Sequence, residues 1–483
     1  MNDVSASRSF RPIAAKALAG GIWREPERTA AILDPFRGET VGTVPVSSAG
    51  DLDAALRAAV EAREKAAAQP AYERAALLRR VAALIERDIQ ELAELMTRET
   101  GKAIRDSEGE IRRSLETFQL AAEEAIRIEG RHVPLDGSAM GAGKMAFLMR
   151  FPVGVVAAIT PFNAPFNLAA HKIAPAIAAG NTMVLKPPPQ APLIVYRLVE
   201  LVVEAGLPPG VLNMVYGGAD IGAALVADPR VEFITFTGSS RAGAAIKAAS
   251  GLRRVALELG GNGATIVHDD ADPAAAAVAC ARNSMRLAGQ SCISVQSVYV
   301  HGRVYESFLS LVEAEVGKMK LGDPLDPATD VGTLIDEAAA RRVESWVQEA
   351  ATAGARVLTG GHRHGAAFEP TVLTRVEPSM KVVCEEVFGP VVNIIPYGKL
   401  EQAFAAINAS PYGLQAGIFT KSNEVSFAAI RQLRVGGVIV NGTSTWRTDQ
   451  LAYGGVKASG VGREGPRYAI EDMTEQRLVV FNL

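Results

Sequence analysis

Cysteine is scarce in this chain of 483 residues. Its three cysteines are Cys280, Cys292 and Cys384. An odd and sparse count argues against a disulfide framework and favours a reducing compartment. Residues 1–21 lack a continuous apolar run after their basic residues. We therefore expect no signal peptide and a cytoplasmic protein.

Long apolar runs and an excess of one charge are also missing. The most apolar stretches, such as Val153 to Ile159, are far too short to span a bilayer. The 50 Lys and Arg residues against 53 Asp and Glu leave a net charge of −3, which excludes a basic footprint for nucleic acid. The six histidines are scattered without ligand spacing, so we expect no metal site. The composition of the whole chain, 48% hydrophobic and 21% charged residues, is typical of a globular protein with a substantial core.

The hydrophobic pattern predicts an α/β fold. Short strands are expected at 29–33 and 41–45, and helices at 51–68, 72–97 and 108–128. Strands and helices then alternate through the segments 153–159, 171–179, 181–185, 193–205, 211–216, 221–227 and 233–236, and again from 264 to 440. Such alternation predicts a parallel, doubly wound sheet. The last residues, 476–483, form a strand with no partner nearby in the sequence, so we expect it to pair with another lobe or subunit.

The segment Gly289-Gln290-Ser291-Cys292 places one thiol after a glycine and two small or polar residues. A cysteine on a tight turn that a substrate can approach is suited to nucleophilic attack. Free cysteine is also among the most buried residue types, so a structural thiol is the alternative. The residue types alone leave both interpretations open.

Two further segments have features of a cofactor site. The expected strand ending at Phe236 is followed by a turn that contains Gly238 and Gly243, and then by a helical pattern. Such a turn can direct backbone N–H groups at a phosphate, although it lacks the full dinucleotide fingerprint and a plain tight turn is the alternative. Lys186 follows another strand and precedes three prolines, which suits contact with a ribose or phosphate. Its alternative is a solvated surface lysine.

These segments, taken with others, resemble the NAD(P)-dependent aldehyde dehydrogenase superfamily. The resemblance covers nearly the whole chain in the family's order, and the sequence around Cys292 and Arg286 is most similar to the lactaldehyde and succinate-semialdehyde dehydrogenase branch. The matching segments are Thr160-Pro161-Phe162-Asn163, Leu185-Lys186-Pro187, Phe236-Thr237-Gly238-Ser239, Leu257-Glu258-Leu259-Gly260-Gly261, Gly289-Gln290-Ser291-Cys292, Glu385-Glu386-Val387-Phe388-Gly389-Pro390, Tyr453-Gly454-Gly455-Val456-Lys457, Ser459-Gly460 and Gly462-Arg463-Glu464-Gly465.

The resemblance implies catalytic roles. Cys292 would attack the aldehyde carbon and form a thiohemiacetal. The side-chain amide of Asn163 and the backbone N–H of Cys292 would form the oxyanion hole. Glu258 would activate the water that hydrolyses the thioester, and partial burial would raise its pKa toward that of a useful base. Lys172 resembles a residue that the family uses in proton relay.

The resemblance also implies cofactor contacts. Glu386 would bind the nicotinamide ribose, and Phe388 would pack near the ring. The positions that contact NAD or NADP would be Thr160, Lys186, Gly238, Ser239, Glu386 and Phe388. Members of the family that prefer NAD often have Glu three residues after the lysine, where this chain has Pro189. Without that carboxylate nothing repels a 2′-phosphate, so we expect NADP to be tolerated or preferred.

Three positions that line the family's aldehyde tunnel are His171, Arg286 and Arg447 in this chain. All three can be cationic or donate hydrogen bonds, and arginine suits bidentate recognition of an anion. The sequence therefore predicts a small aldehyde with an anionic group. As alternatives, Arg286 could pair with an internal acid and Arg447 with Asp449. Arg112 and Arg113 could reach the same mouth from their helix, but we expect them on a solvated helix face.

The predicted function is NAD(P)-dependent oxidation of a small anionic or hydroxylated aldehyde to its carboxylic acid. Semialdehydes, lactaldehyde and sulfo- or phosphono-aldehydes are the candidate substrates. A CoA-acylating semialdehyde dehydrogenase and a non-catalytic structural member of the fold remain as alternatives at this stage.

The resemblance implies an α/β architecture with three parts. Residues 1–130 and 152–259 would form a Rossmann-like NAD(P)-binding domain, and 260–458 the catalytic domain. Residues 131–151 and 459–483 would form a small β element. Its C-terminal strand would join the subunits of a homodimer or homotetramer.

Overall fold

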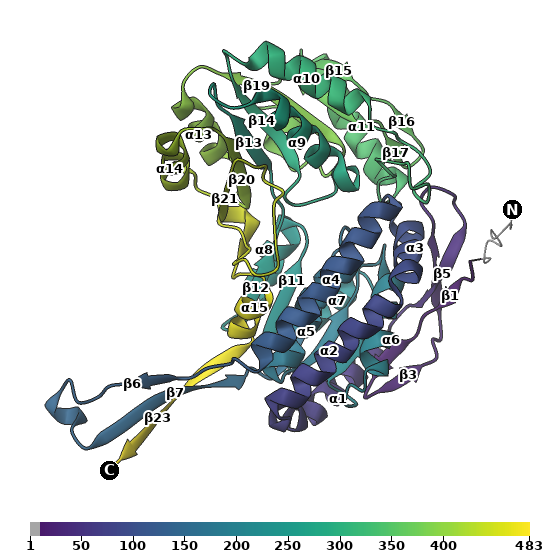
Figure 1. Ribbon diagram of the computed structural model, residues 1–483. Coiled ribbons are helices and arrows are strands. Elements are labelled where there is room, and N and C mark those ends of the chain that lie inside the picture. The colour runs from purple at the N-terminus through teal and green to yellow at the C-terminus, as the bar shows by residue number, and fades with distance from the viewer. Residues whose placement is uncertain (1–9) are drawn as a thin grey trace, which may run out of the picture.

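The computed structural model describes residues 10–483, which form two α/β lobes and a projecting arm (Figure 1). The first lobe is built on an eight-stranded sheet with the order β22-β12-β11-β8-β9-β10-β2-β3. Its strands are β2 (Ala17–Ala19), β3 (Ile22–Arg24), β8 (Val155–Ile159), β9 (Thr182–Lys186), β10 (Leu212–Met214), β11 (Phe233–Thr237), β12 (Arg254–Glu258) and β22 (Gly460–Val461). The five strands from β8 to β12 are parallel, as the alternating pattern predicted.

Helices pack around this sheet because most of its central strands are buried and apolar. They are α1 (Ala49–Ala68), α2 (Ala71–Arg87), α3 (Ile89–Thr100), α4 (Ile104–Ala125), α5 (Pro165–Ala179), α6 (Pro192–Glu204), α7 (Ala219–Ala227), α8 (Ser240–Ala249) and α15 (Pro466–Asp472). A small sheet of β1 (Ile13–Ala14), β5 (Thr40–Pro45) and β4 (Thr29–Leu33) lies beside them.

The single helix expected at 72–97 is wrong. The structure has α2 and α3, which meet at Asp88, whose φ of −104° and ψ of 11° interrupt the helix. The apolar period continues across the break, since Ile85 and Ile89 are both buried. Periodicity alone therefore gave no sign of two helices.

The order of the strands creates a switch point in the first sheet. From β8 the chain adds β9 and β10 on one side, and then returns to add β11 and β12 on the other. In an open α/β sheet, ligands bind in the crevice at the carboxyl ends of the strands at such a point. The segments that carry Asn163, Lys186, Gly238 and Glu258 all leave or end strands at this edge.

The second lobe has a seven-stranded sheet with the order β15-β18-β19-β14-β13-β20-β21, parallel except for β15. Its strands are β13 (Gly263–Val267), β14 (Val295–His301), β15 (Arg356–Thr359), β18 (Thr371–Thr374), β19 (Val391–Tyr397), β20 (Gln415–Phe419) and β21 (Gly437–Val440). Its helices are α9 (Pro273–Met285), α10 (Tyr305–Gly317), α11 (Glu337–Thr352), α12 (Lys381–Cys384), α13 (Leu400–Ala409) and α14 (Asn423–Gln432), with a hairpin of β16 (Arg363–His364) and β17 (Ala367–Phe368).

The arm is a three-stranded antiparallel sheet that extends away from both lobes (Figure 1). It consists of β6 (Arg131–Val133), β7 (Lys144–Pro152) and β23 (Thr474–Asn482), in the order β23-β7-β6. The terminal strand pairs with β7, as expected for the small β element, and its pairing with another subunit stays a prediction. The boundary expected at residue 459 differs, because β22 joins the first sheet beside β12 and α15 packs on α4 and α5. Within residues 10–483, no helix is long and apolar enough to cross a membrane.

Candidate functional site

Cys292 follows a tight turn that connects α9 to β14 in the second lobe. The short 3-10 segment Arg286–Gly289 ends in three residues with positive φ, of which Gly289 has φ +70°. A side chain at Gly289 would collide with the carbonyl oxygen of Gly389, so this position requires glycine. Cys292 is partly exposed, and its Sγ lies 3.1 Å from the hydroxyl of Tyr453. The thiol is thus presented by a backbone of the kind found at functional sites.

Glu258 is the last residue of β12 and is only 6% exposed. Neither carboxylate oxygen has a hydrogen-bond partner within residues 10–483. Burial raises the pKa of Glu258 well above its ordinary value, and the charge of Glu464 adds to this, while Arg447, Lys172 and Arg463 oppose it. A buried carboxylate with free oxygens and a raised pKa is a stronger base than an ordinary carboxylate, so it can accept a proton from a water molecule.

Near Glu258 lies a buried group of charges whose pairing the sequence motifs did not predict. Arg447 pairs with Glu464, and Nζ of Lys172 lies 4.0 Å from Glu464 and donates to two threonine hydroxyls of β11 at 2.8 and 3.1 Å. Burial opposes ionisation of Glu464, but Arg447, His171 and Lys172 lower its pKa to about 2. Glu464 is therefore the ionised member of the carboxyl pair, and Glu258 is the member that exchanges a proton.

The predicted substrate residues Arg286 and Arg447 differ in exposure and in how many of their side-chain donors are occupied by protein partners. Arg286 donates from Nε to Asp106 at 3.1 Å, as its alternative interpretation expected, yet its side chain is 54% exposed. Its two terminal amino groups make no hydrogen bond within residues 10–483. Arg447 is 6% exposed and is held by Glu464. The sequence-based alternative that Arg447 pairs with Asp449 is wrong.

Asp449 instead pairs with Arg113 and His171. It accepts from Nη2 and Nε of Arg113 at 2.6 and 2.8 Å, lies 3.3 Å from Nε2 of His171, and also binds the hydroxyl of Thr117. Burial opposes ionisation, but His171 and Arg113 hold the pKa of Asp449 far below its usual range. The expectation that Arg113 lies on a solvated helix face is therefore wrong, because α4 faces this site.

The turn that carries Asn163 is braced by a buried ion pair. Nζ of Lys102 lies 2.6 Å from Glu110 and donates to the backbone oxygen of Asn163 at 2.8 Å. The other oxygen of Glu110 accepts the N–H groups of Phe166 and Asn167, at 3.0 and 3.1 Å, in the first turn of α5. This pair fixes Asn163 to α4. The sequence did not predict this Lys102–Glu110 ion pair, because no local pattern indicates that Glu110 of α4 binds the first N–H groups of another helix, α5.

Thr160 and Lys186 meet at the carboxyl ends of β8 and β9. The N–H of Thr160 donates to the backbone oxygen of Lys186 at 3.3 Å, and its buried hydroxyl has no partner within residues 10–483. Lys186 is buried, which corrects the solvated-surface alternative. Burial lowers the pKa of its ammonium to about 8, against the opposing charge of Asp220. A free hydroxyl and a buried cation at one sheet edge fit a ribose or phosphate group.

The turn after β11 completes this edge. Ser239 caps α8 by accepting the N–H of Ala242 at 3.3 Å, so the first N–H groups of α8 start beside Gly238. A side chain at Gly238 would meet the ring of Phe236. The helix N-terminus and Lys186 lie at the same edge of the switch point, and the residues present therefore fit a dinucleotide.

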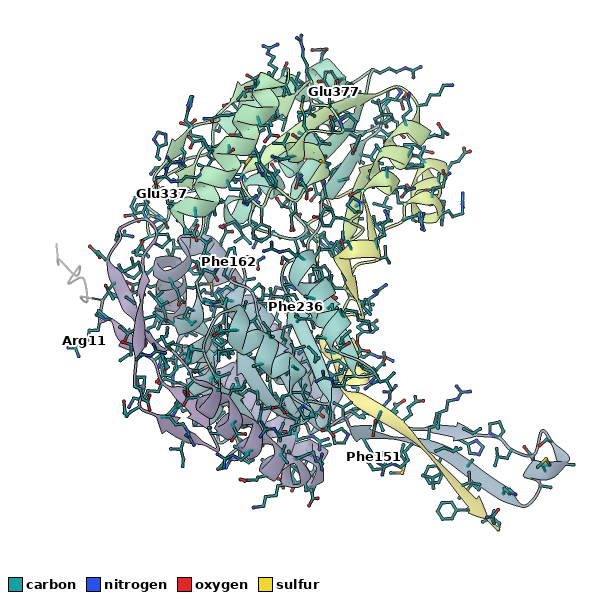
Figure 2. The ribbon with its side chains drawn as sticks, turned by 180° about the vertical axis from the view of Figure 1, so that it is seen from behind. Arg11, Phe151, Phe162, Phe236, Glu337 and Glu377 are labelled. Carbon is teal, nitrogen blue, oxygen red and sulfur yellow. The ribbon has the colours of Figure 1, made fainter. Side chains whose placement is uncertain are left out.

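Glu386 and Phe388 reach this edge from the second lobe. Glu386 accepts the N–H of Gly261 at 2.9 Å, and burial raises its pKa to about 7. The ring of Phe388 meets that of Phe162 edge to face, with 5.8 Å between centroids. Figure 2 shows Phe162 and Phe236 on the side of the first lobe that faces the second. The predicted cofactor residues thus converge from both lobes.

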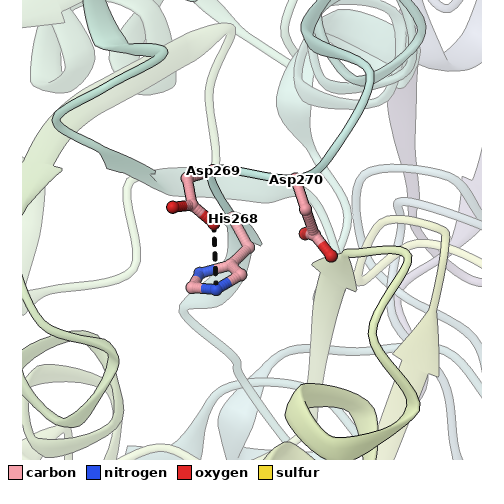
Figure 3. A group of neighbouring side chains, drawn as sticks. All are labelled: His268, Asp269 and Asp270. Carbon is pink, nitrogen blue, oxygen red and sulfur yellow. Dashed lines mark ion pairs between the residues drawn. The ribbon is translucent and has the colours of Figure 1, made fainter.

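A cluster of His268, Asp269 and Asp270 lies at the end of β13, with possible ligand atoms within 4.8 Å of one another (Figure 3). Each member already has a partner. His268 bonds the hydroxyl of Tyr397 at 2.9 Å, Asp269 pairs with Arg303 at 2.8 Å, and Asp270 accepts from a hydroxyl and a backbone N–H that follow β20. These bonds explain the cluster as a junction between strands, and we assign it no role as a site.

Comparisons with known proteins point to one family. Residues 23–479 match the model of the aldehyde dehydrogenase family. A 3-sulfolactaldehyde dehydrogenase from Priestia aryabhattai is 45% identical over 96% of this chain and 97% of that protein. The NADP-dependent succinate-semialdehyde dehydrogenase of Escherichia coli (strain K12) is 37% identical over 97% of this chain and 98% of that protein. Among solved structures, this chain superposes on the crystal structure of aldehyde dehydrogenase 21 from Physcomitrella patens in complex with the reaction product succinate, with a TM-score of 0.95. The two chains are 38% identical, and the match covers 98% of this chain and 99% of the other.

Proposed function

Because the chain belongs to the aldehyde dehydrogenase family and is an NAD(P)-dependent oxidoreductase acting on aldehydes, we propose that Cys292, Glu258 and Asn163 are its catalytic residues. We also propose that its substrate is a small aldehyde with an anionic group. The proposal is carried by a turn-borne thiol, a buried carboxyl with two free oxygens, and an exposed arginine six residues before the thiol in the sequence.

The proposed reaction starts at Cys292. Its thiolate attacks the aldehyde carbon, and the oxygen of the resulting thiohemiacetal is stabilised by the amide of Asn163 and the N–H of Cys292. A nicotinamide held by Glu386 and Phe388 would supply the hydride acceptor for that carbon. The thioester left on Cys292 is attacked by a water whose proton passes to Glu258, which releases the carboxylic acid and the thiolate.

The cofactor would be held by both lobes. Lys186, Thr160 and the start of α8 suit the phosphate and ribose groups, and Glu386 suits the nicotinamide ribose. The position three residues after Lys186 is Pro189, which brings no carboxylate toward a 2′-phosphate. We therefore propose that NADP is accepted or preferred. The kcat/KM values for NAD and NADP, measured with one aldehyde, test this; a strong preference for NAD contradicts it.

The proposed substrate anion would bind to Arg286. Its Nε is held by Asp106, so the guanidinium is oriented while its terminal amino groups remain available for a carboxylate or sulfonate. The relatives' names specify aldehydes that carry such groups, a sulfonate in one and a carboxylate in the other. Arg447, whose charge is paired with Glu464, and His171, whose Nε2 lies 3.3 Å from Asp449, would shape the site without being free to clamp the anion.

We expect Arg286→Ala to lower kcat/KM for succinate semialdehyde and 3-sulfolactaldehyde by about tenfold to a hundredfold, because a hydrogen bond to a charged group is lost. The value for propanal should change little. Steady-state formation of reduced cofactor measures all three. Arg282→Ala, at an exposed arginine of α9, is the matched control. Equal losses for anionic and neutral aldehydes would contradict the proposed role of Arg286.

We also propose that the arm joins subunits of a homodimer or homotetramer. β23 is an edge strand whose apolar side chains Leu478, Val480 and Phe481 are exposed in the single chain. Such an edge is usually covered by another strand. Val480→Asp should therefore lower the molar mass in light scattering, whereas Leu252→Asp, at a fully exposed residue of the first lobe, should not. An unchanged mass for Val480→Asp would count against the arm as the interface.

A further inference from the structure

Tyr453 places a hydroxyl against the nucleophile. The distance from its oxygen to Sγ of Cys292 is 3.1 Å, and Tyr453 is only 4% exposed. Its backbone forms an isolated antiparallel bridge with Glu464, in which the N–H of Tyr453 donates to the oxygen of Glu464 at 3.0 Å. The backbone bridge between Tyr453 and Glu464 therefore fixes the position of the tyrosine that carries this hydroxyl.

A cation lies on the ring of Tyr453. The guanidinium of Arg447 sits 3.8 Å from the ring centroid, and Arg447 is itself fixed by its ion pair with Glu464. A cation over the face of a phenol draws electron density from the ring, so the O–H becomes a better hydrogen-bond donor. Arg447, which sequence analysis assigned to the substrate, thus acts on a tyrosine that touches the reacting sulfur.

The thiol of Cys292 needs such a donor. Burial raises its pKa to about 12, and the charges of Glu386 and Glu258 add to the rise. The hydrogen bond with Tyr453 and the charge of Arg447 act in the opposite direction. Tyr453 and Arg447 are therefore the neighbours that favour the thiolate, against burial, Glu386 and Glu258.

We propose that the Tyr453 hydroxyl donates a hydrogen bond to the Cys292 thiolate and is a further catalytic residue, with Arg447 as its positioning residue. This rests on the proposed function, in which Cys292 is the nucleophile. The thiol proton leaves to Glu258 or to solvent, and Tyr453 keeps its own proton, since burial and the charge of Cys292 raise its pKa well above the ordinary value. When the sulfur bonds to the aldehyde carbon, the negative charge moves to the aldehyde oxygen and the hydrogen bond to sulfur weakens.

The test measures alkylation of Cys292 by iodoacetamide as a function of pH in the full-length protein and in Tyr453→Phe, followed by peptide mass spectrometry. We expect the variant to react about tenfold more slowly at neutral pH, with its profile moved up by about one pH unit. Cys384 in the same protein is the internal reference and should react at an unchanged rate. Tyr468→Phe, on α15, is the matched control.

Several results would overturn this inference. Identical profiles for the two proteins would show that the hydroxyl does not act on the thiolate. A profile moved to lower pH would show that the neutral thiol donates to Tyr453 instead. An unlabelled Cys292 in the unmodified protein would overturn both the nucleophile and its donor. Normal labelling and the expected shift, in a protein that oxidises no aldehyde, would support Tyr453 and contradict the proposed function alone.

The acid limb of the kcat/KM profile gives a second readout. In Tyr453→Phe this limb should shift to higher pH by the same interval as the alkylation profile, because both report ionisation of the Cys292 thiol. If Tyr453 had only a structural role, Tyr453→Phe would lower kcat/KM at every pH and would not change the pH at which the acid limb lies. The thermal midpoint should not change, since Phe retains the buried ring and removes only the hydroxyl.

Discussion

Cys292→Ala is expected to abolish aldehyde oxidation, with kcat reduced by roughly a millionfold, as for the loss of other catalytic nucleophiles. Without the sulfur neither the thiohemiacetal nor the thioester can form. The measurement is formation of reduced cofactor with saturating succinate semialdehyde. Cofactor binding, followed by fluorescence titration, should be nearly unchanged, because the dinucleotide residues lie mainly at the edge of the first sheet.

Cys384→Ala is the matched control for this loss. Cys384 ends α12 and is half-buried, like Cys292, but it makes no hydrogen bond to Tyr453. We expect it to retain full activity. Activity that survives Cys292→Ala, or is lost equally in Cys384→Ala, would be incompatible with the assigned nucleophile and would favour the structural thiol instead.

Glu258→Gln should separate the two halves of the reaction. Hydride transfer should persist as a burst of about one reduced cofactor per active site, because the thioester still forms. The following steady state should slow by about a hundredfold to ten-thousandfold, since no carboxylate accepts the proton of the attacking water. Rapid-mixing absorbance measures both phases. Glu424→Gln, at an exposed carboxyl of α14, is the control.

The pH dependence of the steady state gives the same test in the unmodified protein. Burial and the charge of Glu464 raise the pKa of Glu258, so the basic form is depleted at low pH and grows as the pH rises through that pKa. Hydrolysis should therefore accelerate with pH, and Glu258→Gln should lose this limb. A steady state that depends on added CoA and is unaffected by Glu258→Gln would point to the CoA-acylating alternative.

Local elements of the fold were predictable because their signals are local. The strands β8, β9 and β11 are short apolar runs bounded by glycine, proline or polar residues, and the structure places them as expected. The break at Asp88 was not predictable, since a hydrophobic period carries on through it. The same limit applies to α15, whose packing on α4 and α5 joins segments at least 287 residues apart.

The sequence by itself determined the family, and it predicted the thiol nucleophile, the candidate base and the cofactor edge. Each of these predictions was possible because the residues lie in a contiguous motif and act within a few positions of one another. Only the tertiary structure decided which charges meet. Arg447 pairs with Glu464, Arg113 with Asp449, and Lys102 braces Asn163. Apart from the first pair, whose members are 17 residues apart, these contacts join different elements of the fold. A buried charge finds its partner through packing, and its side chain reaches across space rather than along the chain, so residue order does not reveal that partner.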